Sequence, residues 1–101
     1  MTSHDQARQF AKTYMGALNT GEGAFAALFA HDARVTIAGA PATAAEVRTA
    51  TMPGRSAYRG ARVDAPGFYV LIRVRPGGTA VEERRHRVVL RKDGLIGSLE
   101  A

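Results

Sequence analysis

Apolar residues recur at three- and four-residue steps near the start of the chain, which is the spacing of one buried face of an α-helix. The positions with this spacing are Ala7, Phe10, Ala11, Tyr14, Ala17 and Leu18. Ser3 and Gln6 stand before them in the arrangement of a capping box. Asn19 and Gly21, which tolerate the backbone of a helix end, follow. The pattern predicts an amphipathic first helix that ends before Gly21.

A second apolar face and a strand are predicted next. The apolar face of a short second helix would consist of Ala24, Phe25, Leu28 and Phe29. Val35 and Ile37 then alternate with polar residues as a strand requires. A short, alanine-rich third helix is expected to open near Pro41 or Thr43 and to stop before Pro53.

The rest of the chain has the two-residue period of a sheet. Strands are predicted over residues 58–65, 68–75, 80–92 and 95–99, separated by turns at 65–67, 76–79 and 93–94. The second of these is the strongest, with Phe68, Val70, Ile72 and Val74 on one face. The other face would carry Tyr69, Leu71, Arg73 and Arg75. Three N-terminal helices followed by strands indicate an α+β protein.

Length and composition limit what the chain can be. Its 101 residues predict one domain, 1–101, with a modest core. No apolar run approaches the roughly 20 residues that cross a bilayer, and the N-terminus lacks the pattern of a signal peptide. Without cysteine, and with three scattered histidines, neither a metal site nor a cofactor is predicted. We expect a cytoplasmic protein with no membrane partner.

The positive charge lies in the second half of the sequence. Residues 1–54 hold four basic and four acidic residues, whereas residues 55–101 hold ten basic and five acidic ones, which accounts for the net charge of +5. Three interpretations are open: a solvated arginine-rich sheet face, a basic rim for a carboxylate or phosphate ligand, or nucleic-acid binding. Because the basic residues alternate with strand hydrophobics and no nucleic-acid motif is present, no specific nucleic-acid partner is predicted.

Three segments resemble the SnoaL-like, nuclear-transport-factor-2-like superfamily, which includes ketosteroid isomerase and polyketide cyclase relatives. They are residues 14–22 (YMGALNTGE), residues 28–35 (LFAHDARV) and residues 93–96 (DGLI) before the last strand. The resemblance implies a cone-like α+β barrel, in which three N-terminal helices pack on a strongly curved, mostly antiparallel sheet around a pocket. It also implies a homodimer paired through its sheets.

The resemblance assigns a role to Tyr14. In ketosteroid isomerases of this superfamily, a tyrosine at this place in the first helix donates a hydrogen bond to the developing enolate oxygen. The other isomerase residues are missing. The strand that would supply the carboxylate base reads Arg34-Val-Thr-Ile-Ala38, and a later strand expected to hold a protonated acid reads Arg84-Arg-His-Arg87. Standard ketosteroid isomerase activity is therefore not expected. From the residues alone, Tyr14 is either a core residue with a hydrogen-bonded hydroxyl or a donor aimed into a cavity.

His86 is the second candidate for chemistry. If Val88 and Leu90 face the core, the two-residue period places His86 and Arg84 on the same side, which lines the cavity in the superfamily. A histidine there could act as a general acid or base, or it could be buried or stacked at a dimer interface. A slip of one residue between Ala80 and Lys92 would move His86 to the other face, and the sequence leaves both registers open.

Together these observations predict a small-molecule-binding domain with a hydrophobic pocket that acts, if it is an enzyme, as an isomerase or cyclase on an apolar carbonyl compound. Tyr14 and His86 are the candidate catalytic residues. The candidate ligand-binding residues are Phe10, Phe29, Ile37 and Arg84. The expected partners are a small hydrophobic ligand, neutral or anionic, and a second copy of the chain. The alternative is a non-catalytic ligand-binding or dimerisation domain.

Overall fold

Three helices and six strands occupy the part of the chain that the computed structural model describes, residues 3–51, 56–74 and 80–101. In chain order they are α1 (His4–Thr20), α2 (Glu22–Ala26), β1 (Phe29–Ile37), β2 (Ala40–Pro41), α3 (Ala44–Thr51), β3 (Ser56–Asp64), β4 (Gly67–Val74), β5 (Glu82–Leu90) and β6 (Ile96–Glu100). The strands form one sheet in the order β2-β1-β6-β5-β4-β3. Only β1 and β6 pair in parallel among these neighbours. The predicted α+β class, with three helices on a curved and mostly antiparallel sheet, is confirmed.

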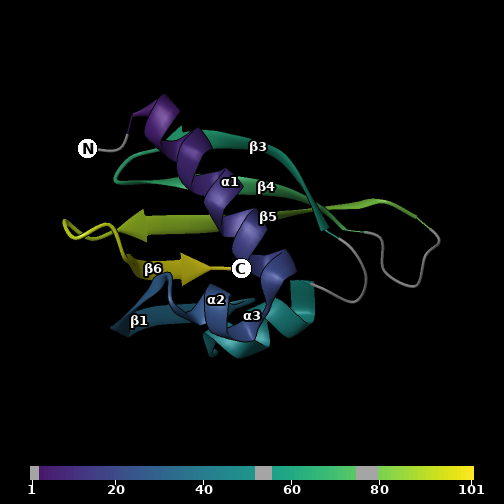
Figure 1. The fold of residues 1–101 in the computed structure, drawn as a ribbon, viewed down its shortest axis with the longest axis horizontal. Helices are drawn as coiled ribbons and strands as arrows, with labels where there is room; N and C mark the ends of the chain where they lie inside the picture. Colours follow the sequence, from purple (N-terminus) through teal and green to yellow (C-terminus); the bar gives the residue numbers. More distant parts are fainter. Residues whose placement is uncertain (1–2, 52–55, 75–79) are drawn as a thin grey trace.

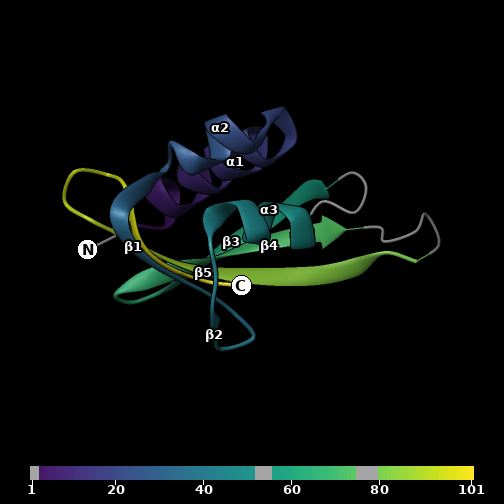
Figure 2. The same ribbon diagram turned by 90° about the horizontal axis from the view of Figure 1, so that it is seen from below.

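The three helices lie on one side of the sheet, and α1 runs obliquely across its strands (Figures 1 and 2). Alternation along the strands explains this layering, because every second side chain of a strand points to the same face. On β4, Phe68, Val70, Ile72 and Val74 are buried, as predicted. The core between the sheet and the helices combines these side chains with the apolar stripe of α1 and with Phe25 and Val47.

Capping boxes start the two longer helices. The Ser3 hydroxyl accepts from the Gln6 backbone N–H at 3.2 Å, and the Gln6 side chain accepts from the Ser3 N–H at 2.9 Å. Thr43 and Glu46 repeat this exchange before α3, with both backbone contacts at 3.1 Å. Each box satisfies amide groups that a helix start would otherwise leave without partners. The capping box predicted for the first helix is therefore confirmed.

The second helix and the strand after it divide differently from the prediction. Helix α2 ends at Ala26, and Phe29 begins β1, where it pairs with Ile96 of the parallel neighbour β6. The helical spacing of Leu28 and Phe29 was misleading because a short apolar run fits a helix or a buried strand equally well. His31 and Asp32 are exposed residues of β1.

A short strand replaces the predicted helix opening at Pro41. Ala40 and Pro41 form β2, whose partner is the end of β1, with Ile37 opposite Ala40. Proline lacks an N–H group and is tolerated in an edge strand such as this one. The third helix begins at Ala44, after the Thr43 cap, so the predicted opening near Thr43 is confirmed and the one at Pro41 is wrong.

Strand β5 is the long basic strand whose register was open. It runs over Glu82–Leu90, within the predicted 80–92, and pairs with β4 so that Phe68 lies opposite Val88 and Val70 lies opposite His86. His86 and Val88 are both buried. The even-numbered residues therefore face the helices, which is the register that places His86 inside. The predicted turn at 76–79 and Arg75 lie outside the described residues.

Strand pairing also brings the backbone unusually close at Gly67. A Cβ atom on this residue would lie 2.1 Å from the Val88 carbonyl oxygen, whereas a Cβ on Gly60 would meet only the Leu71 Cδ1, at 3.7 Å. We expect Gly67→Ala to lower the free energy of unfolding by about 2 kcal/mol or more, because the β4–β5 backbones must separate. Urea unfolding followed by circular dichroism measures the difference.

Gly60→Ala is the matched control. Its Cβ contact is an ordinary one, so we expect a change within about 1 kcal/mol. Equal stabilities for the two variants would contradict the close approach of β4 to β5.

Candidate functional site

Tyr14 and His86, far apart in sequence, meet in the core. Tyr14 lies on the buried face of α1, and His86 faces it from the middle of β5. The Tyr14 hydroxyl and His86 Nδ1 are 2.7 Å apart. Tyr14 is 0% exposed and His86 is 3% exposed. The two residues proposed for chemistry are thus brought together, but inside the packed core.

Thr51 of α3 fixes the direction of this hydrogen bond. Its hydroxyl donates to the Val47 carbonyl at 2.7 Å, and the same oxygen lies 3.5 Å from His86 Nε2. A hydroxyl has one proton, so the His86 Nε2–H must be the donor in the longer contact. A neutral imidazole then has Nδ1 as its acceptor, and the Tyr14 O–H donates to it. The chain of donors runs from Tyr14 through His86 and Thr51 to Val47.

Burial keeps both members of the pair uncharged. Burial raises the pKa of Tyr14 well above its usual value. Burial first, and then the charge of Arg84, lower the pKa of His86 to about 4. Near neutral pH the pair is therefore a neutral phenol that donates to a neutral imidazole. Each polar group satisfies the other, and no buried side-chain nitrogen or oxygen within the described ranges lacks a hydrogen-bond partner.

Aromatic rings surround Tyr14 on its other sides. Phe25 packs edge-on against it, with ring centroids 5.1 Å apart, and Phe29 packs in the same way on Phe25. Phe10 lies 6.4 Å from Tyr14 and 5.7 Å from Phe68, measured between centroids. Such tilted and edge-to-face pairs are the favoured geometry of packed aromatic rings. Phe10, predicted to bind the ligand, therefore packs directly on Tyr14, and Phe29, predicted for the same role, is linked to Tyr14 through Phe25.

The other two predicted ligand-binding residues lie around the same core. Ile37 is partly buried at the end of β1 and packs against the core. Arg84 precedes His86 by two residues on the same face of β5 and forms an ion pair with Glu82. Its side chain is 41% exposed, so the guanidinium reaches solvent.

A separate, open groove of about 580 Å³ lies beside Phe10. Its walls come from the N-terminal half of α1 and from the end of β5 with the turn that follows. The described lining residues are Gln6, Gln9, Phe10, Thr13, Leu90, Arg91, Lys92 and Gly94. Phe10 and Leu90 supply apolar surface, the amides and Thr13 supply polar groups, and no carboxylate belongs to this lining.

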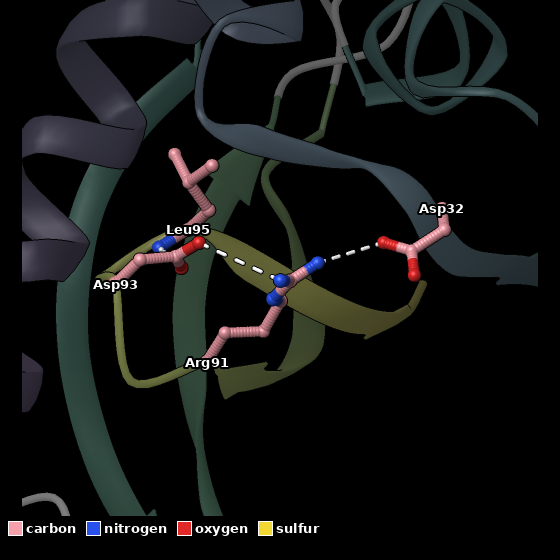
Figure 3. Close-up of polar contacts among 4 residues, drawn as sticks. All are labelled: Asp32, Arg91, Asp93 and Leu95. Carbon is pink, nitrogen blue, oxygen red and sulfur yellow. Dashed lines mark hydrogen bonds and ion pairs between the residues drawn. The ribbon is translucent and has the colours of Figure 1, made fainter.

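Arg91 is held at the groove by two carboxylates from different parts of the chain (Figure 3). Its Nη1 lies 2.8 Å from an Asp32 oxygen on β1, and its Nη2 lies 3.7 Å from an Asp93 oxygen. Asp93 also accepts from the Leu95 backbone N–H at 3.0 Å. The neighbouring Lys92 makes no ion pair with the described residues, so it supplies the unbalanced positive charge of this edge.

The sequence prediction included only Phe10 among the groove residues. One signal for the other α1 residues was available: Gln9 and Phe10 follow Gln6, and precede Thr13, by three or four residues, so the four form a continuous stripe on α1. The opposite wall, Leu90 to Gly94, could not be found in this way, because its position depends on where the β5–β6 turn folds back.

Two kinds of feature are absent from the described ranges. No helix there is long and apolar enough to span a membrane. No three histidine or acidic side chains gather there closely enough to hold a metal ion.

Solved structures match the chain, whereas no family model and no curated protein does. The de novo designed NTF2-fold protein NT-9 aligns with a TM-score of 0.67 at 19% identity, covering 98% of this chain and 85% of that chain. The chain has an NTF2-like fold. A protein of unknown function with a cystatin-like fold from Methylobium petroleophilum PM1 aligns at 0.68 with 20% identity, covering 97% and 75%. A de novo designed protein with a curved β-sheet reaches 0.70 at 19% identity, covering 91% and 80%. Identities this low support the fold and carry no activity to this chain.

The buried imidazole predicts a loss of stability in acid. His86 titrates near pH 6.5 when the chain is unfolded and near pH 4 when it is folded. Between these values the unfolded state binds a proton that the folded state does not. The part of the free energy of unfolding that depends on neutral His86 is therefore fully present above pH 6.5. It decreases as the pH drops toward 4, and the whole loss is about 3 kcal/mol. Urea unfolding measured from pH 7.5 to pH 4 tests this.

His86→Gln is the control for that experiment. Glutamine does not titrate, and its side-chain oxygen can still accept from Tyr14. Exposed carboxylates and the other histidines are the same in both proteins, so the difference between the two curves isolates His86. Parallel pH curves would show that the imidazole is not buried in its neutral form.

Tyr14→Phe tests the core hydrogen bond directly. The substitution keeps the ring packing but leaves His86 Nδ1 without its donor. We expect a loss of about 1–3 kcal/mol in the free energy of unfolding, the cost of one unsatisfied buried group. Tyr58→Phe, on a partly buried ring that makes no hydrogen bond with the described residues, should change it by less than about 0.5 kcal/mol. Equal effects of the two substitutions would contradict the Tyr14–His86 bond.

Proposed function

We propose that this protein is a small-molecule-binding domain that holds its ligand in the groove beside Phe10, and that Tyr14 and His86 stabilise the core instead of reacting. The observation that carries the proposal is the 2.7 Å bond between the Tyr14 hydroxyl and His86 Nδ1, with both side chains buried. The Tyr14 hydroxyl and His86 Nδ1, the groups predicted to act on a substrate, already form a hydrogen bond with each other. The groove, by contrast, is open to a ligand.

The acid–base properties of the pair also argue against catalysis. A general acid or base works best with a pKa near the working pH and needs its atom within hydrogen-bond reach of the substrate. His86 has a pKa of about 4, and the pKa of Tyr14 is raised further above neutrality. An isomerase or cyclase built on this pair would have to break the bond and open the aromatic core around it before any proton moved.

The groove favours a small molecule with an apolar body and a hydrogen-bond acceptor. Phe10 and Leu90 offer an apolar surface to such a body. Gln6 accepts from Ser3 with its side-chain oxygen, so its amide nitrogen remains available as a donor. Lys92 adds a positive charge, while Asp32 and Asp93 balance the charge of Arg91. A ketone or a carboxylate fits this set of donors better than an amine does.

The SnoaL-like relationship, the cytoplasmic location and the absence of a cofactor stay predictions from the sequence. The fold is compatible with a ligand-binding role, since the same scaffold can carry binding sites and enzymes alike.

Benzoate, acetophenone and benzylamine are suitable probes, because they share a ring and differ in the polar group. We expect benzoate and acetophenone to shift amide signals of the groove residues in two-dimensional NMR, with benzylamine weakest because of Lys92. Gln9→Trp, which fills the groove from an exposed position of α1, should weaken benzoate binding by about tenfold or more. Thr49→Trp places the same ring at an exposed position of α3 and should leave binding unchanged.

The enzyme alternative predicts the opposite pattern. In that case the shifted signals would centre on Tyr14, His86 and Thr51, Tyr14→Phe would weaken the ligand, and Gln9→Trp would not. Shifts of that kind, or no binding of any of the three probes, would overturn the proposal.

A further inference from the structure

The sheet face that points away from the helices is lined by arginines around a small apolar centre. The helices cover the other face only (Figure 2). Tyr69 and Leu71 of β4 alternate with the buried residues of that strand and lie on the outward side, half-buried. The strand register places Arg62 and Arg87 on either side of Tyr69, and Arg85 opposite Leu71. We call Arg62, Arg73, Arg85 and Arg87, with Tyr69 and Leu71, the arginine face.

Most of the arginines on this face form no ion pair with the described residues. Arg87 bonds Asp64, with 3.4 Å between Nε and the carboxylate, and Glu83 pairs with Arg59 at 3.2 Å. Arg62, Arg73 and Arg85 are exposed and form no ion pair with any described residue. The remaining acidic group, Glu100, lies opposite Arg87 in the strand register. The face therefore keeps an excess of positive charge.

We propose that the arginine face binds an acidic segment of a partner protein. Arginine and aromatic residues are enriched in protein interfaces, where a planar guanidinium can hold a carboxylate with two hydrogen bonds. Arg85 lies with its Cζ 5.9 Å from the centroid of the Tyr69 ring, which holds the guanidinium against the sheet. Tyr69 and Leu71 offer apolar surface at the centre. Around it lie Arg62, Arg73 and Arg85, which form no ion pair within the described ranges.

Charge decides between this partner and a second copy of the chain. A two-fold dimer through the arginine face would bring Arg62, Arg73 and Arg85 of each copy toward those of the other. Like charges brought together across an interface are strongly unfavourable. The three acidic residues near the face already lie beside its arginines: Glu83 pairs with Arg59 and lies opposite Arg73, and Asp64 and Glu100 lie beside Arg87. They therefore cannot also neutralise the arginines of a second copy. An acidic partner removes this repulsion, and a second copy increases it.

Single-stranded nucleic acid fits the face less well than an acidic protein does. Sheet surfaces that bind single strands present aromatic rings on which bases stack. Here the described outward residues of β3, β4 and β5 include one aromatic ring, Tyr69, and Arg85 lies over it. Phosphates could still be attracted to the arginines, but the face lacks a free ring for base stacking.

The test uses a fluorescein-labelled peptide of glutamates interspersed with leucines, followed by fluorescence anisotropy near 0.15 M salt. Arg73→Glu with Arg85→Glu reverses two charges of the face. Arg8→Glu with Lys12→Glu makes the same net change on exposed positions of α1. We expect the face variant to bind at least about tenfold more weakly and the α1 variant to stay within about twofold of wild type.

Substitutions to glutamine, which remove the charges without reversing them, keep the test decisive if charge reversal disturbs the sheet. Arg73→Gln with Arg85→Gln, against Arg8→Gln with Lys12→Gln, should show the same order of affinities, with circular dichroism confirming that all variants fold. A peptide with glutamine in place of glutamate should not bind. Equal weakening by the face and α1 variants, or no binding of the acidic peptide, overturns the proposal.

Two further measurements test whether nucleic acid or a second copy of the chain occupies the arginine face instead. An oligo-dT strand that binds more tightly than the peptide, and loses affinity only in the face variant, would assign the face to nucleic acid. Light scattering that shows a dimer in wild type and a monomer in the face variant would assign it to a second copy. Either result would overturn the acidic-protein proposal.

Discussion

The hydrogen bond between Tyr14 and His86 is the polar constraint on which the centre of this fold depends. It joins the buried face of α1 to the middle of β5 across an otherwise apolar core. A polar group in such a place costs free energy unless it has a partner, so each residue requires the other. The same requirement holds β5 in its register, because a shift of one residue would move His86 to the outer face and leave the Tyr14 hydroxyl alone.

This pairing changes how the similarity to NTF2-like proteins should be interpreted. A tyrosine and a histidine that face each other inside such a fold look, from the sequence, like the two halves of an acid–base site. In this chain the rings of Phe10 and Phe25 pack against Tyr14, Phe29 packs on Phe25, and Tyr14 is fully buried. The pair is therefore better suited to stabilising the core than to meeting a substrate, and the groove between α1 and the β5–β6 turn becomes the better candidate for a ligand.

The basic residues divide between two surfaces with different surroundings. Beside the groove, Arg91 is balanced by Asp32 and Asp93 and has a defined position (Figure 3). On the sheet face away from the helices, Arg62, Arg73 and Arg85 form no ion pair with a described carboxylate. The high content of arginine alone did not separate these cases. The difference lies in whether the fold brings a carboxylate within reach.

Local pattern determined much of the fold. The spacing on α1, its capping box and the alternation of β4 each appear in the structure where the sequence placed them, because neighbouring residues alone decide capping and periodicity. The predicted end of α2 was wrong because Phe29 pairs with Ile96 of β6, and this contact joins residues distant in sequence.

The candidate site shows the same division between local pattern and tertiary contacts. The sequence selected Tyr14 and His86 as separate candidates and left the face of His86 open, and only tertiary packing decided that they bond to each other. The wall of the groove from Leu90 to Gly94 and the Asp32–Arg91 contact likewise required the folded chain, because both depend on contacts between distant residues that no local pattern encodes.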